Sequence, residues 1–250
     1  MVRMNETLNT LLNHRSIRDF TEQEVGEETM GTLFDAAMHA STSRGFQHAS
    51  VIRIKDPAIR QELARIGNQR RVATAPELMV FIVDARRSVR IREELGQDPE
   101  VARSADVFRE GFTDAVIMAQ NLTVAAESMG LGACYLGCVL NEYETLIDLL
   151  KLPEYTFPVV GLMLGHPASQ PGLKPRMPKE LRIMEDTYSE PDSWVEALTG
   201  YDATMREYYG QRETNNRDDG FTSQVVNNLV ERPSRNRFFS LAKAQGFNVR

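Results

Sequence analysis

The chain has 250 residues, of which 42% are hydrophobic and 26% charged, with 2 Cys and a formal net charge of −6. This composition excludes intrinsic disorder, collagen-like repeats and a disulfide-stapled scaffold, and the negative charge argues against nucleic-acid binding. No apolar run reaches the roughly 20 residues of a membrane-spanning helix, and the N-terminus lacks the apolar region of a signal peptide, so we expect a cytoplasmic protein without a membrane partner.

Apolar spacing predicts helices and strands that alternate along the chain. In chain order they are helices at 6–12 and 27–38, a strand at 48–54, a helix that begins at Pro57 and is closed by Gly67, a strand at 78–83, a long helix at 109–129, strands at 133–136 and 157–164, and helices at 221–230 and 234–244. The strand at 78–83 is an unbroken apolar run, typical of a strand covered on both faces. The long helix is apolar nearly all round, which indicates burial on more than one side. We therefore predict an α+β fold with a small mixed sheet packed among helices.

The composition changes after Trp194, where the stretch 201–217 is polar and aromatic. We interpret residues 1–200 as the core of a single domain and residues 201–250 as a C-terminal extension. This extension is too small to fold alone, and in an oligomer it would wrap a neighbouring subunit.

Side-chain catalytic motifs are absent from the sequence. It contains no Gly-x-Ser-x-Gly elbow, Walker loop, His-Glu-x-x-His or Gly-x-Gly-x-x-Gly motif. Cys134 and Cys138 lie in an apolar segment without a second Cys or His pair, which favours packing over a redox or metal role. We predict no metal site. If the protein is an enzyme, its reactive group comes with a cofactor.

The segment from His14 to Phe20 follows the first helix and should be extended. In an extended segment His14, Ser16 and Arg18 share one face, which offers an imidazole, a hydroxyl and a guanidinium. Such a set suits a phosphate and an electron-rich ring edge. Composition alone favours a charged, solvent-exposed turn. A second cationic pair, Lys174 and Arg176, flanks a rigid proline.

Several segments together resemble the nitroreductase family, in particular its larger NADPH-preferring branch. The ordered set is far more specific than any one member. It consists of His14–Arg18, Gly67–Gln69, Ala125–Gly132 followed by Tyr135–Gly137, Leu173–Pro178, and Tyr208–Tyr209 before Asn215–Arg217.

The resemblance implies a nitroreductase-like fold and an intertwined homodimer with one FMN per subunit at the interface. The FMN phosphate would be held by His14, Ser16, Lys174 and Arg176, with help from Arg15. Arg18 would lie at the N1/O2 edge of the ring, where positive charge stabilises the reduced flavin.

The same resemblance assigns the rest of the flavin site. Gln69 would hydrogen-bond the pyrimidine end, and the backbone N–H of Gly137 would point at N5. The remaining residues implied at the flavin are Tyr135 and Leu136 beside N5, and Thr42 and Arg44 from the partner subunit.

Two positions depart from the family pattern. Cys138 stands where the family often has a second Gly; its backbone N–H can still serve the flavin O4, but its side chain needs room. Arg212 and Arg217 match the residues implied to bind the NADPH phosphates, whereas Asp218 stands where relatives carry another Arg. The acid weakens a 2′-phosphate site, so NADH is the alternative donor. We expect the stretch between Tyr209 and Phe221 to be a mobile loop over the flavin.

We therefore predict an FMN-dependent NAD(P)H oxidoreductase with ping-pong hydride transfer through FMN N5 to nitroaromatics, quinones or similar electron-poor acceptors. No side-chain acid or base is required. One alternative is an NAD(P)H:FMN reductase that releases free reduced flavin. A second is a non-catalytic flavin sensor or storage protein, against which Arg212 and Arg217 argue, since storage needs no dinucleotide site.

Overall fold

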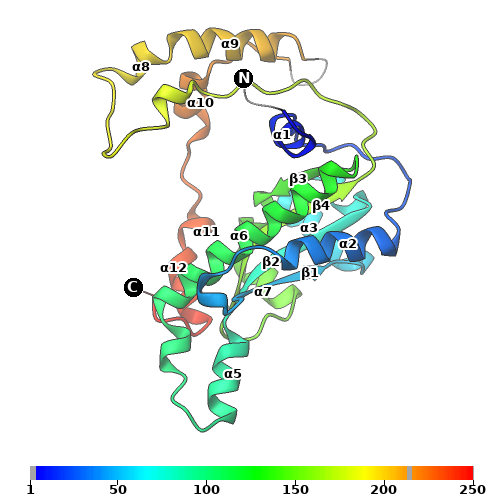
Figure 1. Cartoon of the computed structure of the whole chain (residues 1–250), viewed down its shortest axis with the longest axis vertical. Helices are drawn as coiled ribbons and strands as arrows, with labels where there is room; N and C mark the ends of the chain where they lie inside the picture. Colours follow the sequence, from blue (N-terminus) through cyan, green and yellow to red (C-terminus); the bar gives the residue numbers. More distant parts are fainter. Residues whose placement is uncertain (1–3, 213–215, 250) are drawn as a thin grey trace. The chain divides into compact units, whose positions relative to one another are not determined.

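The computed structural model describes residues 4–212 and 216–249 (Figure 1). Its contacts divide the chain into two compact units, the first formed by Met1–Pro171 with Pro233–Arg250 and the second by Gly172–Arg232. The predicted boundary at residue 200 stays a prediction. The first unit contains helices α1 (Glu6–Leu12), α2 (Glu27–Met38), α3 (Pro57–Gly67), α4 (Arg71–Thr74), α5 (Arg86–Glu94), α6 (Ala105–Ser128), α7 (Tyr143–Leu149), α11 (Pro233–Asn236) and α12 (Phe238–Ala244), and the 3₁₀ turns η1 (Ser43–Gly45), η2 (Glu100–Arg103) and η3 (Gly137–Glu142).

The first unit is built on a sheet of four strands, β1 (Ala49–Arg53), β2 (Glu77–Asp84), β3 (Gly132–Leu136) and β4 (Thr156–Gly165), in the order β1-β2-β4-β3. The predicted α+β class, with a small sheet among helices, is confirmed. The prediction of a mixed sheet is wrong for these strands, because each neighbouring pair is antiparallel. The chain returns through α3 to place β2 antiparallel beside β1, and apolar spacing alone does not specify strand direction.

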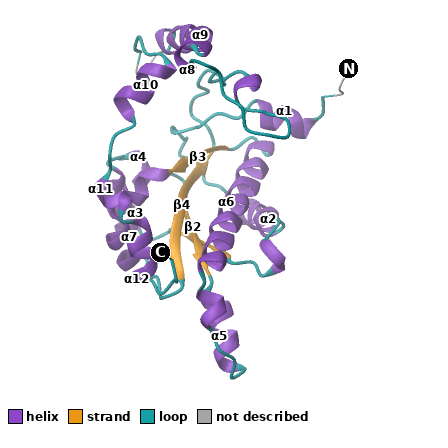
Figure 2. Cartoon of the chain, turned by 90° about the vertical axis from the view of Figure 1, so that its left-hand side faces the viewer, coloured by secondary structure: helices purple, strands orange, loops and turns teal. Residues whose placement is uncertain are grey.

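Strand β2 is covered on both faces, as its sequence predicts. Met79, Phe81 and Val83 belong to one apolar cluster with residues of α2 and α6. Leu78 and Ile82 belong to a second cluster with residues of α3 and α7. Figure 2 shows α2 and α6 on one side of the strands and α3 and α7 on the other. The sheet is therefore the middle layer of three, and its strand ends carry the loops of the site.

Helix α6 is the long helix predicted from apolar spacing. It begins before the predicted start because the Ser104 hydroxyl accepts a hydrogen bond from the backbone N–H of Val107. Its inner face is fully buried against the sheet, but Val116 and Ile117 remain 45% and 36% exposed. Burial on more than one side is therefore incomplete within one chain. No helix in the described ranges is long and apolar enough to cross a membrane.

Two helix boundaries differ from the predictions. The single helix expected at 234–244 is broken into α11 and α12 at Arg237, whose ψ of 6° leaves the helical region. Helix α3 includes Gly67, and the left-handed residue that ends it is Asn68, with φ of 48°. Its start is as expected, since Asp56 Oδ1 accepts from the N–H of Ala58 at 2.7 Å.

The second unit contains η4 (Lys179–Leu181), α8 (Trp194–Ala197), α9 (Thr199–Gly210) and α10 (Phe221–Asn228). The carboxylate of buried Asp202 on α9 accepts hydrogen bonds from the N–H and hydroxyl of Thr222. The hydroxyl of Tyr201 donates to the carbonyl of Pro175 at 3.3 Å. These bonds tie both α10 and the segment with Lys174 to α9. The predicted helix at 221–230 ends early, at Asn228.

Candidate functional site

The segment from His14 to Arg18 lies along the outer edge of β3. The N–H of Ile17 donates to the carbonyl of Ala133 at 2.9 Å, and Ser16 forms a parallel bridge with the same residue. Ile17 is buried directly against Gly132, where an added Cβ would lie 2.5 Å from Ile17 Cγ1. A glycine is thus required for this close approach, which fixes the segment to the sheet.

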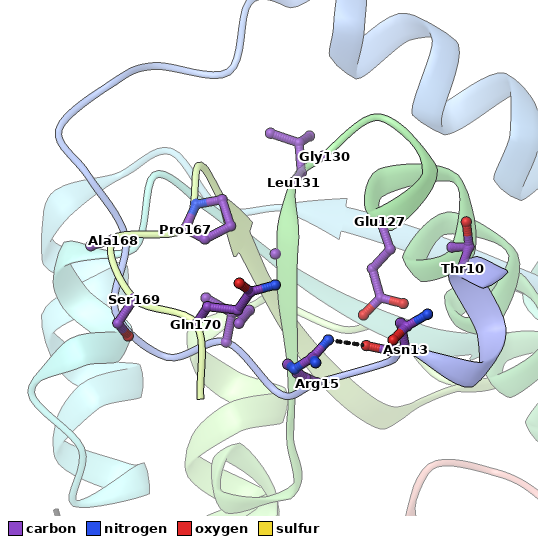
Figure 3. Close-up of a pocket in the computed structure, with 12 residues that line it drawn as sticks. Thr10, Asn13, Arg15, Glu127, Gly130, Leu131, Pro167, Ala168, Ser169 and Gln170 are labelled. Atoms are coloured by element: carbon purple, nitrogen blue, oxygen red, sulfur yellow. Dashed lines mark hydrogen bonds between the residues drawn. The ribbon is translucent and has the colours of Figure 1, made fainter. Parts of the chain in front are cut away.

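Arg15 and His14 have partners within the first unit, and Figure 3 shows the contact between Arg15 and Asn13. Arg15 donates to the carbonyls of Pro171 and Asn13 at 2.9 and 2.8 Å, and its side chain lines a cavity of about 510 Å³ together with Ile17. His14 Nδ1 lies 2.6 Å from Glu127 Oε1. Since Arg15 and Ile17 share the cavity side, alternation places Ser16 and Arg18 on the other side of the segment. The phosphate roles of His14, Arg15 and Ser16 stay predictions.

Arg18 is exposed and, across the described ranges, its guanidinium has no hydrogen-bond or ion-pair partner. It lies near the buried Cys134 of β3. Burial raises the pKa of the Cys134 thiol, and the charge of Arg18 acts in the opposite direction. A cation without a carboxylate partner is available for an anionic or electron-rich ligand.

Gln69 and Cys138 come from neighbouring loops. The left-handed turn at Asn68 leaves Gln69 exposed just after α3. An added Cβ on Gly67 would lie 2.9 Å from Cys138 Sγ, so the thiol occupies the space that this glycine leaves free. The Cys138 side chain therefore finds its room against α3. Burial raises the pKa of the thiol, which favours its protonated form at neutral pH.

Gly137 is exposed at the end of β3, and an added Cβ there would meet no heavy atom within 4 Å. A flat ligand could thus approach its backbone closely. Leu136 is buried. Tyr135 is half-buried, and its hydroxyl hydrogen-bonds Thr123 and Gln120 of α6 at 3.0 and 3.1 Å. In the first unit, Arg18, Gln69 and Gly137 therefore lie around β3 and the turn that follows it.

The loop with Thr42 and Arg44 contacts the N-terminal half of α6. Arg44 donates to both carboxylate oxygens of buried Glu110, at 3.1 and 2.7 Å. Hydrogen bonds from Arg44 hold the pKa of Glu110 below its usual range despite burial. Glu110 and Glu127, which contacts His14, are far enough apart in sequence to be separated by about 25 Å at a 1.5 Å rise per residue. One chain therefore keeps the Arg44 contact on α6 far from the His14 contact on the same helix.

The second unit holds the remaining predicted cations. Lys174, Arg212 and Arg217 surround the ring of Tyr209, at 5.8, 5.7 and 3.9 Å from its centroid. Arg217 also donates to Asp219 at 3.0 Å. Arg176 is exposed and donates weakly to the carbonyl of Lys174 at 3.4 Å. Residues 213–215, including Asn215 of the predicted motif, lie outside the described ranges.

This geometry offers an open backbone edge, an uncommitted guanidinium and a cluster of cations, and similarity to known families decides how to interpret it. A model described as Nitroreductase family matches residues 11–166, and one described as Nitroreductase family, C-terminal domain matches residues 174–250. The chain belongs to the nitroreductase family. The first match spans β1 to β4 together with the segment from His14 to Arg18.

Similar members of the nitroreductase family are known from several bacteria. The chain is 38% identical to the FMN reductase (NADPH) of Bacillus subtilis, over 98% of this chain and 99% of that protein. It is 38% identical to the oxygen-insensitive NADPH nitroreductase of Salmonella typhimurium, over 91% and 92%. The structure of the nitroreductase NfrA1 of B. subtilis matches with a TM-score of 0.90 at 37% identity, over 97% and 99% of the two chains. That of the NADPH:FMN oxidoreductase of Vibrio harveyi complexed with NAD⁺ matches with 0.86 at 34%, over 98% and 100%.

Sequence reasoning missed several residues that hold the loops carrying the predicted flavin residues. Two buried carboxylates, Glu110 and Asp114, hold the η1 loop, with Asp114 accepting from the N–H groups of Ser43 and His48. Two acids one helical turn apart on an otherwise apolar helix were an available signal. Arg235 and its partners Gly137 and Asn141 carried no sequence signal, because they meet only through the return of the C-terminus.

Proposed function

We propose that this protein is an FMN-dependent NAD(P)H oxidoreductase of the nitroreductase type. The observation that carries the proposal is the gathering of uncommitted Arg18, exposed Gln69 and the open Gly137 backbone around β3. The relatives named FMN reductase (NADPH) and NADPH nitroreductase, at 38% identity over nearly the whole chain, support the same activity.

The residues present fit FMN. The cofactor is flat, anionic at its phosphate and rich in acceptors, whereas this site supplies an open glycine edge and unpaired positive charge. FMN, when bound, supplies the N5 atom that accepts and returns hydride. The chain would bind the phosphate with His14, Ser16, Lys174 and Arg176, set Arg18 and Gln69 at the pyrimidine end, and direct the Gly137 N–H toward N5.

The donor site of this proposal is the cation cluster around Tyr209 on the C-terminal extension. Arg212 and Arg217 would receive the phosphates of NADPH, with NADH as the alternative donor. Donor and acceptor would use one open face in turn, so that the acceptor enters after the oxidised nicotinamide leaves. Nitroaromatics, quinones and flavins fit such a face, because the reaction needs position and charge but no side-chain acid.

A homodimer completes the proposed site. Glu110, which pairs with Arg44, is about 25 Å along α6 from Glu127, which contacts His14, so we assign Thr42 and Arg44 to the flavin of a partner subunit. Val116 and Ile117 on the outer face of α6 are exposed and apolar. A second copy would cover such a patch. Both cysteines are free, which agrees with a cytoplasmic location.

Two other functions remain candidates. A flavin reductase would release free reduced FMN, which the name of the B. subtilis relative favours. A sensor or storage protein would bind flavin without turnover. Three measurements distinguish the oxidoreductase from these two alternatives: flavin content, oligomeric state, and NADPH oxidation with and without an added quinone. The proposal predicts a yellow dimer that oxidises NADPH mainly when an acceptor is present; a colourless monomer that takes up no FMN would overturn it.

Arg18→Ala should weaken FMN binding more than Arg15→Ala does. Arg18 is uncommitted, whereas Arg15 donates to two backbone carbonyls on the cavity side of its segment. Losing one charge-assisted hydrogen bond costs about 1.5–3 kcal/mol, so we expect about a tenfold to hundredfold rise in the FMN dissociation constant for Arg18→Ala. Titration of each apoprotein with FMN, monitored by fluorescence quenching, measures the dissociation constants of both variants. Equal effects would mean that the two roles are misassigned.

A further inference from the structure

Arg235 on α11 reaches back to the turn that follows β3. Its Nη2 donates to the carbonyl oxygen of Gly137 at 2.7 Å and to Asn141 Oδ1 at 2.6 Å, and its Nε donates to the same Oδ1 at 3.0 Å. Asn141 Nδ2 in turn donates to the carbonyl of Ile66 at 2.9 Å. One guanidinium and one amide thus join the C-terminal segment to η3 and to the end of α3.

These bonds end on the two loops that carry the proposed flavin contacts. Ile66 immediately precedes Gly67, Asn68 and Gln69, and Gly137 begins η3. Gly67 also touches the Cys138 thiol. The bridge through Asn141 therefore fixes the spacing between Gln69 and the Gly137 backbone, although neither Arg235 nor Asn141 belongs to the predicted cofactor set.

The bond to Gly137 has an electronic consequence as well. The carbonyl of Gly137 and the N–H of Cys138 are the two ends of one peptide group. A cation that hydrogen-bonds the carbonyl oxygen polarises the group and strengthens its N–H as a donor, because hydrogen bonds in a chain reinforce one another. This N–H is the one that could serve the flavin O4.

We propose that Arg235 is a positioning residue that acts on the flavin through the Gly137–Cys138 peptide. It holds this peptide in one orientation and makes the Cys138 N–H a stronger donor toward the ring, which favours the electron-rich reduced cofactor over the oxidised one. The inference rests on the proposed function, since it needs FMN in the site.

A neighbouring ion pair provides a matched control. Arg237, two residues further along, donates to both carboxylate oxygens of Glu144 on α7 at 2.7 and 2.9 Å. This pair also ties the C-terminal segment to α7, but it touches neither Gly137 nor α3. A residue that only anchors the C-terminus should behave like Arg237.

The test compares the flavin-loaded dimers of wild type, Arg235→Ala, Arg235→Lys and Arg237→Ala. The midpoint potential is measured by equilibrium reduction against a reference dye, the FMN dissociation constant by titration, and the melting temperature by circular dichroism. For Arg235→Ala we expect a more negative potential and about a tenfold or greater loss in the ratio of reduced to oxidised FMN affinity. Arg235→Lys keeps a cation for Gly137 and should recover most of this ratio, whereas Arg237→Ala should keep the wild-type potential.

The opposing results are distinct. If Arg235→Ala lowers the melting temperature as Arg237→Ala does but leaves the potential unchanged, Arg235 is only an anchor and the inference is wrong. If Arg235→Ala does not fold, Arg235→Gln, which keeps a neutral donor, must show the shifted potential, and a wild-type potential there overturns the inference. Wild-type protein that binds no FMN would overturn the proposed function itself.

Discussion

Replacing both Arg212 and Arg217 by Ala is expected to raise the Michaelis constant for NADPH by about one to two orders of magnitude, at about 1.4 kcal/mol per factor of ten, and to leave that for NADH almost unchanged. The two guanidiniums flank the Tyr209 ring, with that of Arg217 3.9 Å from the centroid. Contact with the ring limits the freedom of the Arg217 side chain, so less entropy is lost when it binds a phosphate. NADH lacks the 2′-phosphate, so its Michaelis constant should not depend on these two arginines.

Steady-state kinetics with both donors tests this expectation, and Arg182→Ala is the control, because it removes an exposed arginine from the same unit. Asp218→Arg should shift selectivity toward NADPH. Asp218 is exposed and lies 3.6 Å from Arg206, so the change removes a negative charge from a cationic region. If the double variant raises the Michaelis constants for NADPH and NADH equally, the stretch between Tyr209 and Phe221 is a general cover over the site, and recognition of the 2′-phosphate is refuted.

Gly132→Ala is expected to destabilise the protein by about 1–3 kcal/mol and to weaken FMN binding at the same time. The new methyl group would lie between 2.5 and 2.8 Å from three side-chain atoms of buried Ile17. These are not flexible side-chain ends, since the β-branched Ile17 is held by its bond to Ala133. The segment must therefore shift away from β3, and Ser16 and Arg18 move with it.

Gly31→Ala is the matched control for this change. Gly31 lies on the exposed surface of α2, where an added Cβ meets nothing within 4 Å. Alanine there should stabilise the helix by about 0.5–1 kcal/mol. Urea unfolding and FMN titration are measured for both variants. Unchanged stability and FMN affinity in Gly132→Ala would show that the segment is not set by its contact with Gly132.

Local patterns were sufficient to predict much of the fold. The unbroken apolar run of β2, the Asp56–Pro57 helix start and the apolar face of α2 each reflect an interaction within a few residues, and each appears as expected. Strand direction was not predictable in this way, because it depends on how α3 returns the chain to the sheet. The break at Arg237 was also hidden, since it coincides with contacts to Glu144, far away in the sequence.

The site shows the same division between local and distant information. Motif resemblance named Arg18, Gln69 and Gly137, and the structure gathers them around β3. The resemblance did not predict that Arg44 pairs with Glu110 or His14 with Glu127, because both partners are on α6, far away in the sequence. It also did not predict where the Cys138 thiol lies, because that depends on packing against Gly67.

Anaerobic stopped-flow mixing of the FMN-loaded protein with NADPH, followed by a second mix with a quinone, tests the central claim most directly. We expect NADPH to bleach the flavin absorbance in the first step, without acceptor, and the quinone to restore it in the second step, with no NADPH remaining. Flavin that NADPH does not bleach, or that bleaches only when the quinone is already present, would contradict an oxidoreductase that works by two separate half-reactions.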